Sequence, residues 1–258
     1  MTRREVLQVA FATIVRKEVN RFVRIWPQTI LPPAVSMTLY FVIFGNLIGA
    51  RIGLMGGFNY IDFIAPGLIM MSVMNNAYAN VVSSFFGAKF QHHIEEMLVA
   101  PIPNWVILAG YVTGGVLRGL AVGIVVTAIA MFFTHLRVSS VVTIIAILML
   151  TTVLFSLGGL VNAIYAKKFD DISIIPTFVL TPLIYLGGVF YSIDLLPPFW
   201  KAVSYVNPIV YMVDAFRYGL LGISHMHLGA AFAIITLFVF ALYGYSLLLL
   251  ERGTGIKS

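Results

Sequence analysis

Residues 138–166 read VSSVVTIIAILMLTTVLFSLGGLVNAIYA and contain no Asp, Glu, Lys or Arg. A helix that crosses the hydrocarbon layer needs about 20 apolar residues, because each residue advances about 1.5 Å through a layer about 30 Å thick. The stretch is continuously apolar, whereas barrel strands alternate polar and apolar residues. It therefore predicts a transmembrane helix near 141–166.

Five further stretches that are largely free of charge predict helices near 27–49, 60–86, 105–133, 172–193 and 228–250. The first 26 residues are charged and lack the apolar core of a signal peptide. We therefore expect an all-α membrane protein with a single transmembrane domain over 1–258. Its parts are a surface helix within 1–26, a bundle of six transmembrane helices over 27–250 and a tail over 251–258.

The composition excludes several classes of protein. Of the 258 residues, 60% are hydrophobic and 10% are charged, whereas a soluble domain carries about 25% charged residues. The mean hydropathy of +0.98 agrees. A soluble enzyme, a disordered regulator and a nucleic-acid-binding module are therefore excluded. The chain has no cysteine, so it holds no disulfide, catalytic thiol or zinc–thiolate site.

Lysine and arginine are distributed unequally between the two predicted sides of the membrane, and they favour the cytoplasmic side. Eleven lie on one side: Arg3, Arg4, Arg16, Lys17, Arg21, Arg24, Lys89, Lys167, Lys168, Arg252 and Lys257. Four lie in the opposite connections: Arg51, Arg137, Lys201 and Arg217. The bias predicts that both termini are cytoplasmic, which agrees with an even number of spans.

Residues 3–26 predict a basic amphipathic helix that lies in the headgroup layer. Its apolar face carries Leu7, Phe11, Ile14, Phe22 and Ile25, and its polar face carries Arg4, Arg16, Lys17, Asn20, Arg21 and Arg24. Two interpretations stay open, a surface anchor and a lever that transmits force from a cytoplasmic partner. Pro27, Pro32 and Pro33 mark the bend into the first span.

The second connection, residues 87–103, predicts a short amphipathic helix that ends before Pro101 and Pro103. Phe90, Ile94 and Met97 recur three or four residues apart, which places them on one helical face. This helix either docks onto a partner or lies at the membrane interface.

Residues 194–227 combine Asp194, several prolines, Asn207 and Asp214 with many apolar residues, and neither half is long enough to span. Irregular backbone at membrane depth requires cover by protein or access to water. The segment therefore predicts broken or re-entrant helices at the outer face before the last span. The alternative is an external loop packed on the membrane.

Arg118 lies near the middle of the third predicted span, where an arginine costs about 2.5–3.5 kcal/mol on insertion scales. No acidic residue shares its predicted depth, so carbonyls, hydroxyls or water must solvate it. It serves either helix or dimer packing or the binding of a substrate anion. The same span carries small residues four apart that favour close helix packing: Gly110, Gly114, Gly115, Gly119 and Gly123.

The sequence contains no phosphate-binding loop, no H-E-x-x-H zinc motif and no G-x-S-x-G motif with a serine nucleophile. His92-His93 and His225-x-His227 are weak metal signals, because neither pair belongs to a recognisable set of metal ligands. We therefore expect no catalytic activity, metal site or cofactor in this chain by itself.

Taken together, these parts resemble the type-two ABC exporter permeases. The resemblance rests on the basic N-terminal helix, the six spans, the run Glu95-Glu-Met-Leu-Val-Ala-Pro101 and the segment Asn207-Pro-Ile-Val-Tyr-Met-Val-Asp-Ala-Phe-Arg-Tyr-Gly219. The last segment is the most specific, since Asn-Pro followed by a spaced arginine recurs before the final span of that family.

The resemblance implies a half-transporter of a bacterial cytoplasmic (inner) membrane that pairs with a second copy of itself. Two separate ATPase subunits would bind the pair and would hold the ATP and magnesium. It also implies that the helix after the second span contacts the ATPase through Phe90, Gln91, His92, Glu95, Glu96 and Met97. The 167–171 connection would add a second contact, and Asn207, Pro208, Asp214 and Arg217 would belong to the outer re-entrant segment. An ion-coupled carrier and a non-transporting membrane scaffold are the competing hypotheses.

Overall fold

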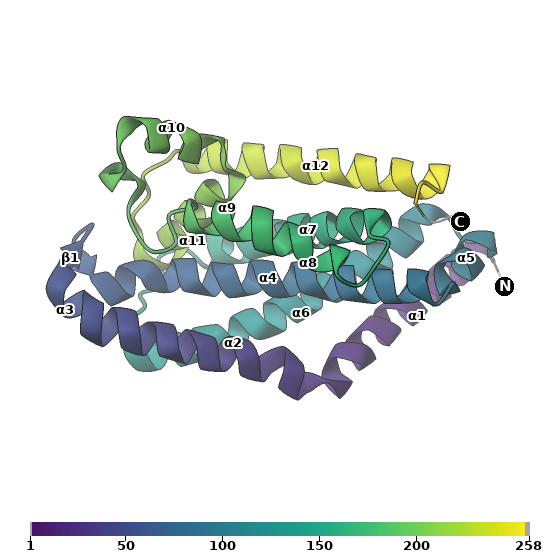
Figure 1. Cartoon of the computed structure of the whole chain (residues 1–258), viewed down its shortest axis with the longest axis horizontal. Helices are drawn as coiled ribbons and strands as arrows, with labels where there is room; N and C mark the ends of the chain where they lie inside the picture. The colour runs from purple at the N-terminus through teal and green to yellow at the C-terminus, as the bar shows by residue number, and fades with distance from the viewer. Residues whose placement is uncertain (1, 256–258) are drawn as a thin grey trace.

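A computed structural model describes residues 2–255 as an elongated bundle of helices (Figure 1). The longest helix, α4 (Tyr60–Phe90), runs through its middle and is buried along most of its length. Helices α6 (Asn104–Phe133) and α7 (Val141–Tyr165) pack along α4. In Figure 1, α2 (Trp26–Tyr40) and α12 (Leu228–Arg252) lie on opposite flanks.

The remaining elements complete the fold. They are α1 (Arg3–Arg24), the π-helical turn η1 (Phe41–Ile48), α3 (Gly49–Ile52), β1 (Leu54–Met55), β2 (Phe58–Asn59), α5 (His93–Val99), α8 (Asp171–Ile175), the π-helical turn η2 (Pro176–Leu180), α9 (Thr181–Tyr185), the 3₁₀ turn η3 (Ile193–Leu195), α10 (Pro198–Val206) and α11 (Pro208–Leu221). The strands β1 and β2 form one antiparallel hairpin, in which Leu54 pairs with Asn59. Gly56 and Gly57 make its turn at φ of 60° and 84°, where residues with side chains are strained.

Both ends of the chain lie beside α5 at one end of the bundle, called the α5 end below (Figure 1). The β1–β2 hairpin and α10 lie at the opposite end, called the α10 end. Helix α12 continues to Arg252, two residues beyond the predicted span, and a turn follows to residue 255. The last three residues of the predicted tail, including Lys257, lie outside the described residues.

The helical content agrees with the predicted class of an all-α membrane protein. Four segments are long and apolar enough to cross a membrane, namely 26–52, 104–133, 141–165 and 228–252. They coincide with the first, third, fourth and sixth predicted spans. The second predicted span coincides with α4, which is long enough but carries amides such as Asn75, Asn76 and Asn80.

The fifth predicted span is shorter than expected. Continuous helix begins at Asp171 and ends at Tyr185, whereas the apolar run predicts a helix to residue 193. Gly187 and Gly188 explain the difference. Gly188 adopts φ of 71°, and a Cβ on Gly187 would lie 2.6 Å from the Ile209 side chain. The chain therefore turns after α9 instead of continuing as a helix, because these glycines permit a tight turn against α11.

Candidate functional site

Helix α1 is attached to the bundle by a polar cluster that its amphipathic pattern does not predict. We define the α1 cluster as Glu18, Arg21, Asn80 and Ser84. Glu18 has no exposed surface and accepts hydrogen bonds from Ser84 Oγ (2.5 Å), Asn80 Nδ2 (3.4 Å) and Arg21 (3.3 Å). Arg21 also donates to the backbone oxygen and Oδ1 of Asn80 at 2.9 and 2.8 Å.

The position of Arg21 corrects one prediction. Its guanidinium lies against α4, whereas the helical pattern placed it on the solvated polar face of α1. The signal that could have revealed the cluster is Glu18 itself. It falls four residues after Ile14 and four before Phe22, within the apolar stripe, where an acid must be buried with partners.

The glycine ridge of α6 makes the close approach of α1 possible. A Cβ on Gly114 would lie 2.5 Å from Glu18 Cβ, and one on Gly110 would lie 2.5 Å from Ile14 Cγ2. A Cβ on Gly115 would lie 3.0 Å from the Ala77 carbonyl oxygen of α4. The ridge therefore seats α1 on one side and α4 on the other, which confirms the predicted role of these glycines in packing.

The predicted short helix after the second span exists, with a different start. Phe90 is the last residue of α4, and Gln91 and His92 form a turn in which His92 adopts a left-handed φ of 62°. Helix α5 begins at His93, directly after this turn. Phe90 therefore extends from α4 and does not lie on α5 as the spacing predicted.

The six residues predicted to contact an ATPase differ in exposure. Phe90, Gln91, His92 and Glu96 are exposed, and we call these four the α5 surface. Glu95 is partly exposed, and its Oε1 lies 3.0 Å from His92 Nδ1. Met97 is partly buried and packs against the hydrophobic core, so it supports α5 from beneath.

The structure brings the α5 surface together with the 167–171 connection. The ring of Phe169 lies 5.1 Å from that of Phe90 and 5.0 Å from that of Phe86, measured between centroids. Lys89 Nζ donates to the carbonyl oxygens of Ile164 (2.6 Å) and Ala166 (2.7 Å) at the end of α7. The two connections thus form one continuous surface at the α5 end.

Near the middle of the bundle, α2, α4 and α6 line an open crevice of about 380 Å³ that we call the Arg118 crevice. Its polar lining includes Arg118, Asn76, Asn75, Ser72 and Ser36. Arg118 donates from Nη2 to Asn76 Oδ1 at 3.4 Å. Among residues 2–255, its buried Nε has no hydrogen-bond partner, and no acidic side chain lines the crevice. The sequence located this arginine but not the amides that face it.

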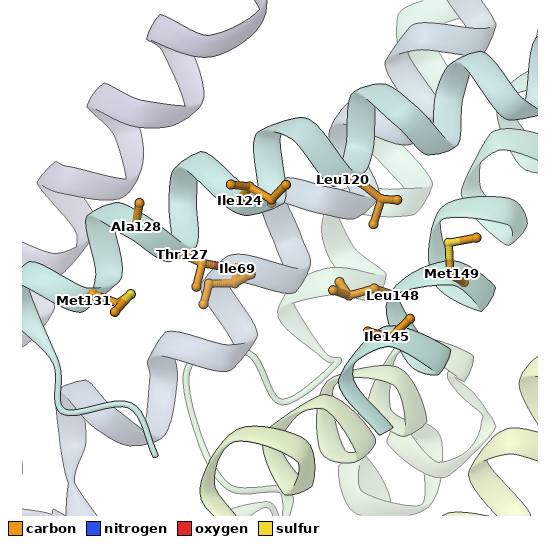
Figure 2. A pocket seen from close by; sticks show the side chains of 10 residues that line it. Ile69, Leu120, Ile124, Thr127, Ala128, Met131, Ile145, Leu148 and Met149 are labelled. Carbon is orange, nitrogen blue, oxygen red and sulfur yellow. The ribbon is translucent and has the colours of Figure 1, made fainter. Parts of the chain in front are cut away.

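A second hollow, of about 470 Å³, lies between α6 and α7 and is apolar (Figure 2). Ile124, Thr127 and Met131 approach it from α6, Ile145 and Met149 from α7. Ile69 of α4 forms its floor. This hollow has no charged lining residue among those described, and apart from Thr127 its side chains are apolar.

The segment predicted to lie at the outer face is divided into η3, α10 and α11. The break falls at Asn207, whose Oδ1 caps α11 by accepting from the Ile209 backbone N–H at 3.0 Å, and Pro208 begins the helix. Arg217 is only 2% exposed. It donates to the carbonyl oxygens of Phe63 (3.3 Å) and Gly188 (2.7 Å) and stacks 4.0 Å above the Phe63 ring centroid.

Carboxylates fix the loops at the α10 end. Asp214 is buried and accepts from Ser224 Oγ (2.7 Å) and from the backbone N–H groups of His225 and Met226 (3.2 Å). Asp194 lies 2.7 Å from Lys201 Nζ, and this hydrogen bond holds the pKa of the Asp194 carboxyl below its ordinary value. These four predicted outer residues, Asn207, Pro208, Asp214 and Arg217, therefore position loops and helices.

No group of three or more His, Asp or Glu side chains is placed to hold a metal ion within residues 2–255. His92 pairs with Glu95, and His225 Nδ1 lies 3.0 Å from Asp194 Oδ2.

The amino-acid sequence is similar to a family of membrane transport proteins. The family model described as ABC-2 type transporter matches residues 9–221. The inner membrane transport permease YadH of Escherichia coli K12 is 62% identical over 250 residues, covering 97% of this chain and 98% of the relative. Segments 169–173 and 186–198 predict similarity to YadH in particular, and this match confirms it. Nodulation protein J of Neorhizobium galegae is 25% identical over 240 residues, covering 89% of this chain and 88% of the relative.

Proposed function

Because the chain belongs to the ABC-2 type transporter family, whose members are membrane permeases of ABC transporters, we propose that it forms half of an ATP-driven exporter. Two copies pair in the inner membrane, and two separate ATPase subunits bind the pair and hold ATP and magnesium. The chain itself binds no cofactor and catalyses no reaction.

The proposed topology has six spans within one permease domain over 1–258. Four of the spans are the apolar segments described above, and helix α4 and the 171–185 segment are the other two. Helices α10 and α11 form the re-entrant segment at the outer face. Both termini are cytoplasmic, so the α5 end faces the cytoplasm. The basic residues in these segments support this orientation, and Figure 1 supports it because both ends of the chain lie beside α5.

The α5 surface is the observation that carries the proposed ATPase contact. It presents exposed aromatic and polar side chains at the end of the bundle, next to the exposed Phe169. A soluble partner that docks there buries Phe90 and Phe169, which otherwise lie exposed at 58% and 56%. Such exposed aromatic pairs are typical of binding surfaces.

The contacts of α4 can transmit motion from the ATPase contact at α5 to the rest of the bundle. Helix α5 follows α4 after a turn of two residues, and α4 is the central helix of the bundle. The α1 cluster joins α1 to the same helix. Closure of the ATPase subunits therefore moves α5, α4 and α1 together, and the two bundles tilt to open a pathway along their shared interface. This motion requires two global states with different partner contacts.

Family membership favours this function over the ion-coupled carrier and the scaffold. The double variant Glu95→Lys/Glu96→Lys tests it in the permease–ATPase complex reconstituted into vesicles. We expect loss of most of the substrate-stimulated ATPase activity, with normal membrane insertion. The control is Glu251→Lys, which reverses an exposed acid at the end of α12. Unchanged coupling in the double variant would refute the assigned contact.

A further inference from the structure

We propose that the Arg118 crevice binds the anionic headgroup of an amphiphilic molecule, an inference that rests on the exporter function and names its substrate class. The headgroup chemistry is a compact anion with several acceptor oxygens, such as phosphate. The apolar chain of the molecule remains in the bilayer beside α2. Four observations on the crevice support this assignment.

The first is the unused hydrogen-bonding capacity of Arg118. A guanidinium carries five N–H donors in a planar fork that matches the oxygens of phosphate or carboxylate. Among residues 2–255, Arg118 makes one side-chain hydrogen bond, the 3.4 Å contact with Asn76, and its buried Nε is unpaired. A charge in this position of a span is costly, so a ligand that occupies the remaining donors offsets the cost.

The second observation is the contrast with Arg217, an arginine that is buried among helices. Arg217 is 2% exposed, donates to two carbonyl oxygens and stacks on an aromatic ring. That is the environment of an arginine whose role is packing. Arg118 instead lines an open crevice and has only the long contact with an amide. The packing interpretation of Arg118 therefore fits its surroundings poorly.

The third observation is the polarity of the crevice wall. Asn75 and Ser36 are exposed to it near the middle of the bundle, and Ser72 Oγ is buried without a partner among the described residues. Polar groups facing hydrocarbon cost several kcal/mol each in such a position, by order of magnitude. The crevice therefore holds water or a polar ligand, and amides and hydroxyls can donate to an anion beside the guanidinium.

The fourth observation concerns the apolar chain. Pro32, Ser36 and Tyr40 of α2 line the crevice. The preceding residue in each case, Leu31, Val35 and Leu39, is at least half exposed. These three residues are four apart, so they form a stripe along α2 directly beside the crevice. A molecule with a polar head and an apolar tail fits both surfaces, whereas a free inorganic anion uses only one.

The test is equilibrium binding to the full chain in phosphatidylcholine nanodiscs without ATPase. The probe is dodecyl phosphate, with neutral dodecyl maltoside and inorganic phosphate as comparison ligands. We expect Arg118→Gln to weaken dodecyl phosphate binding by about tenfold or more, since it removes charged hydrogen bonds. Arg118→Lys keeps the charge without the fork and should retain intermediate affinity. Arg137→Gln, which removes an exposed arginine outside the crevice, should bind as the unmodified chain does.

Equal affinity of Arg118→Gln and the unmodified chain for dodecyl phosphate would overturn the proposal. So would equal binding of dodecyl maltoside, or inorganic phosphate bound as tightly as the amphiphile. A change of oligomeric state in Arg118→Gln, with Arg118→Lys restoring it, would assign the arginine to the dimer interface and overturn the proposal too. Folding is monitored by thermal unfolding of each variant, and the lysine variant keeps the test valid if the glutamine variant unfolds.

This binding assay contains no ATPase, so it separates the two proposals. Intact headgroup binding in a chain that fails to couple to any ATPase would refute the exporter function alone. Intact ATP-driven transport, together with headgroup binding that does not change when Arg118 is replaced, would refute only the proposed headgroup site.

Discussion

Removal of the Glu18 carboxylate should release α1 from the bundle. Glu18→Ala deletes an acceptor that is fully buried and holds Ser84, Asn80 and Arg21. Breaking a buried ion pair by removing one partner costs about 3–5 kcal/mol. The cost is lower here, because the Arg21 side chain is 28% exposed and keeps both hydrogen bonds to Asn80. We therefore expect a loss of about 2–3 kcal/mol for the attachment of α1.

That loss corresponds to an increase of about 30- to 150-fold in the population with α1 detached. Hydrogen exchange of the α1 backbone in nanodiscs measures it directly, because detachment exposes amides that packing protects. Arg16→Ala is the matched control, since it removes a charge from the exposed face of the same helix. Exchange in Glu18→Ala that matches this control would refute the role of the α1 cluster as the anchor.

Two further predictions concern packing and pH. Gly115→Ala places a methyl group 2.6 Å from Val81 Cγ2, and overpacking of this kind costs about 1–3 kcal/mol. The melting temperature of this variant should therefore fall. The control Gly244→Ala places its methyl group in open space and should leave the melting temperature unchanged. The Asp194 contact with Lys201 lowers the carboxyl pKa, so it stabilises α10 above the ordinary pKa of about 4 and is lost as the pH falls through the lowered value. Because Asp194 and Lys201 are partly exposed, their ion pair contributes little to stability. A spin label on a cysteine introduced into α10 should therefore become modestly more mobile only in strong acid, and Asp194→Asn should show the same small increase already at neutral pH. A pH-independent signal in both proteins would contradict this.

The sequence was sufficient to predict the long helices, because a run of apolar residues has one stable arrangement in a bilayer. The α6 glycine ridge followed from spacing alone and is confirmed, since only glycine allows helices to approach so closely. The fifth span was overestimated because composition does not reveal that Gly187 and Gly188 turn the chain against α11.

The site was harder to predict than the fold. The pattern assigned Phe90 to the short helix, but the left-handed turn at His92 leaves it on α4, and a turn of this kind has no signal in apolar spacing. Arg118 was found because a charge in an apolar run is conspicuous, while the amides that face it belong to other helices. The place of Glu18 within the apolar stripe of α1 is the sequence signal for the α1 cluster.

The stoichiometry and activity of the purified complex test the central claim most directly. The tagged permease should carry an ABC ATPase subunit through purification, and native mass spectrometry should show two copies of each chain. ATP hydrolysis should belong to the complex and be absent from the permease alone. A permease that purifies without any ATPase from a membrane containing its partner, or that hydrolyses ATP by itself, would contradict the account.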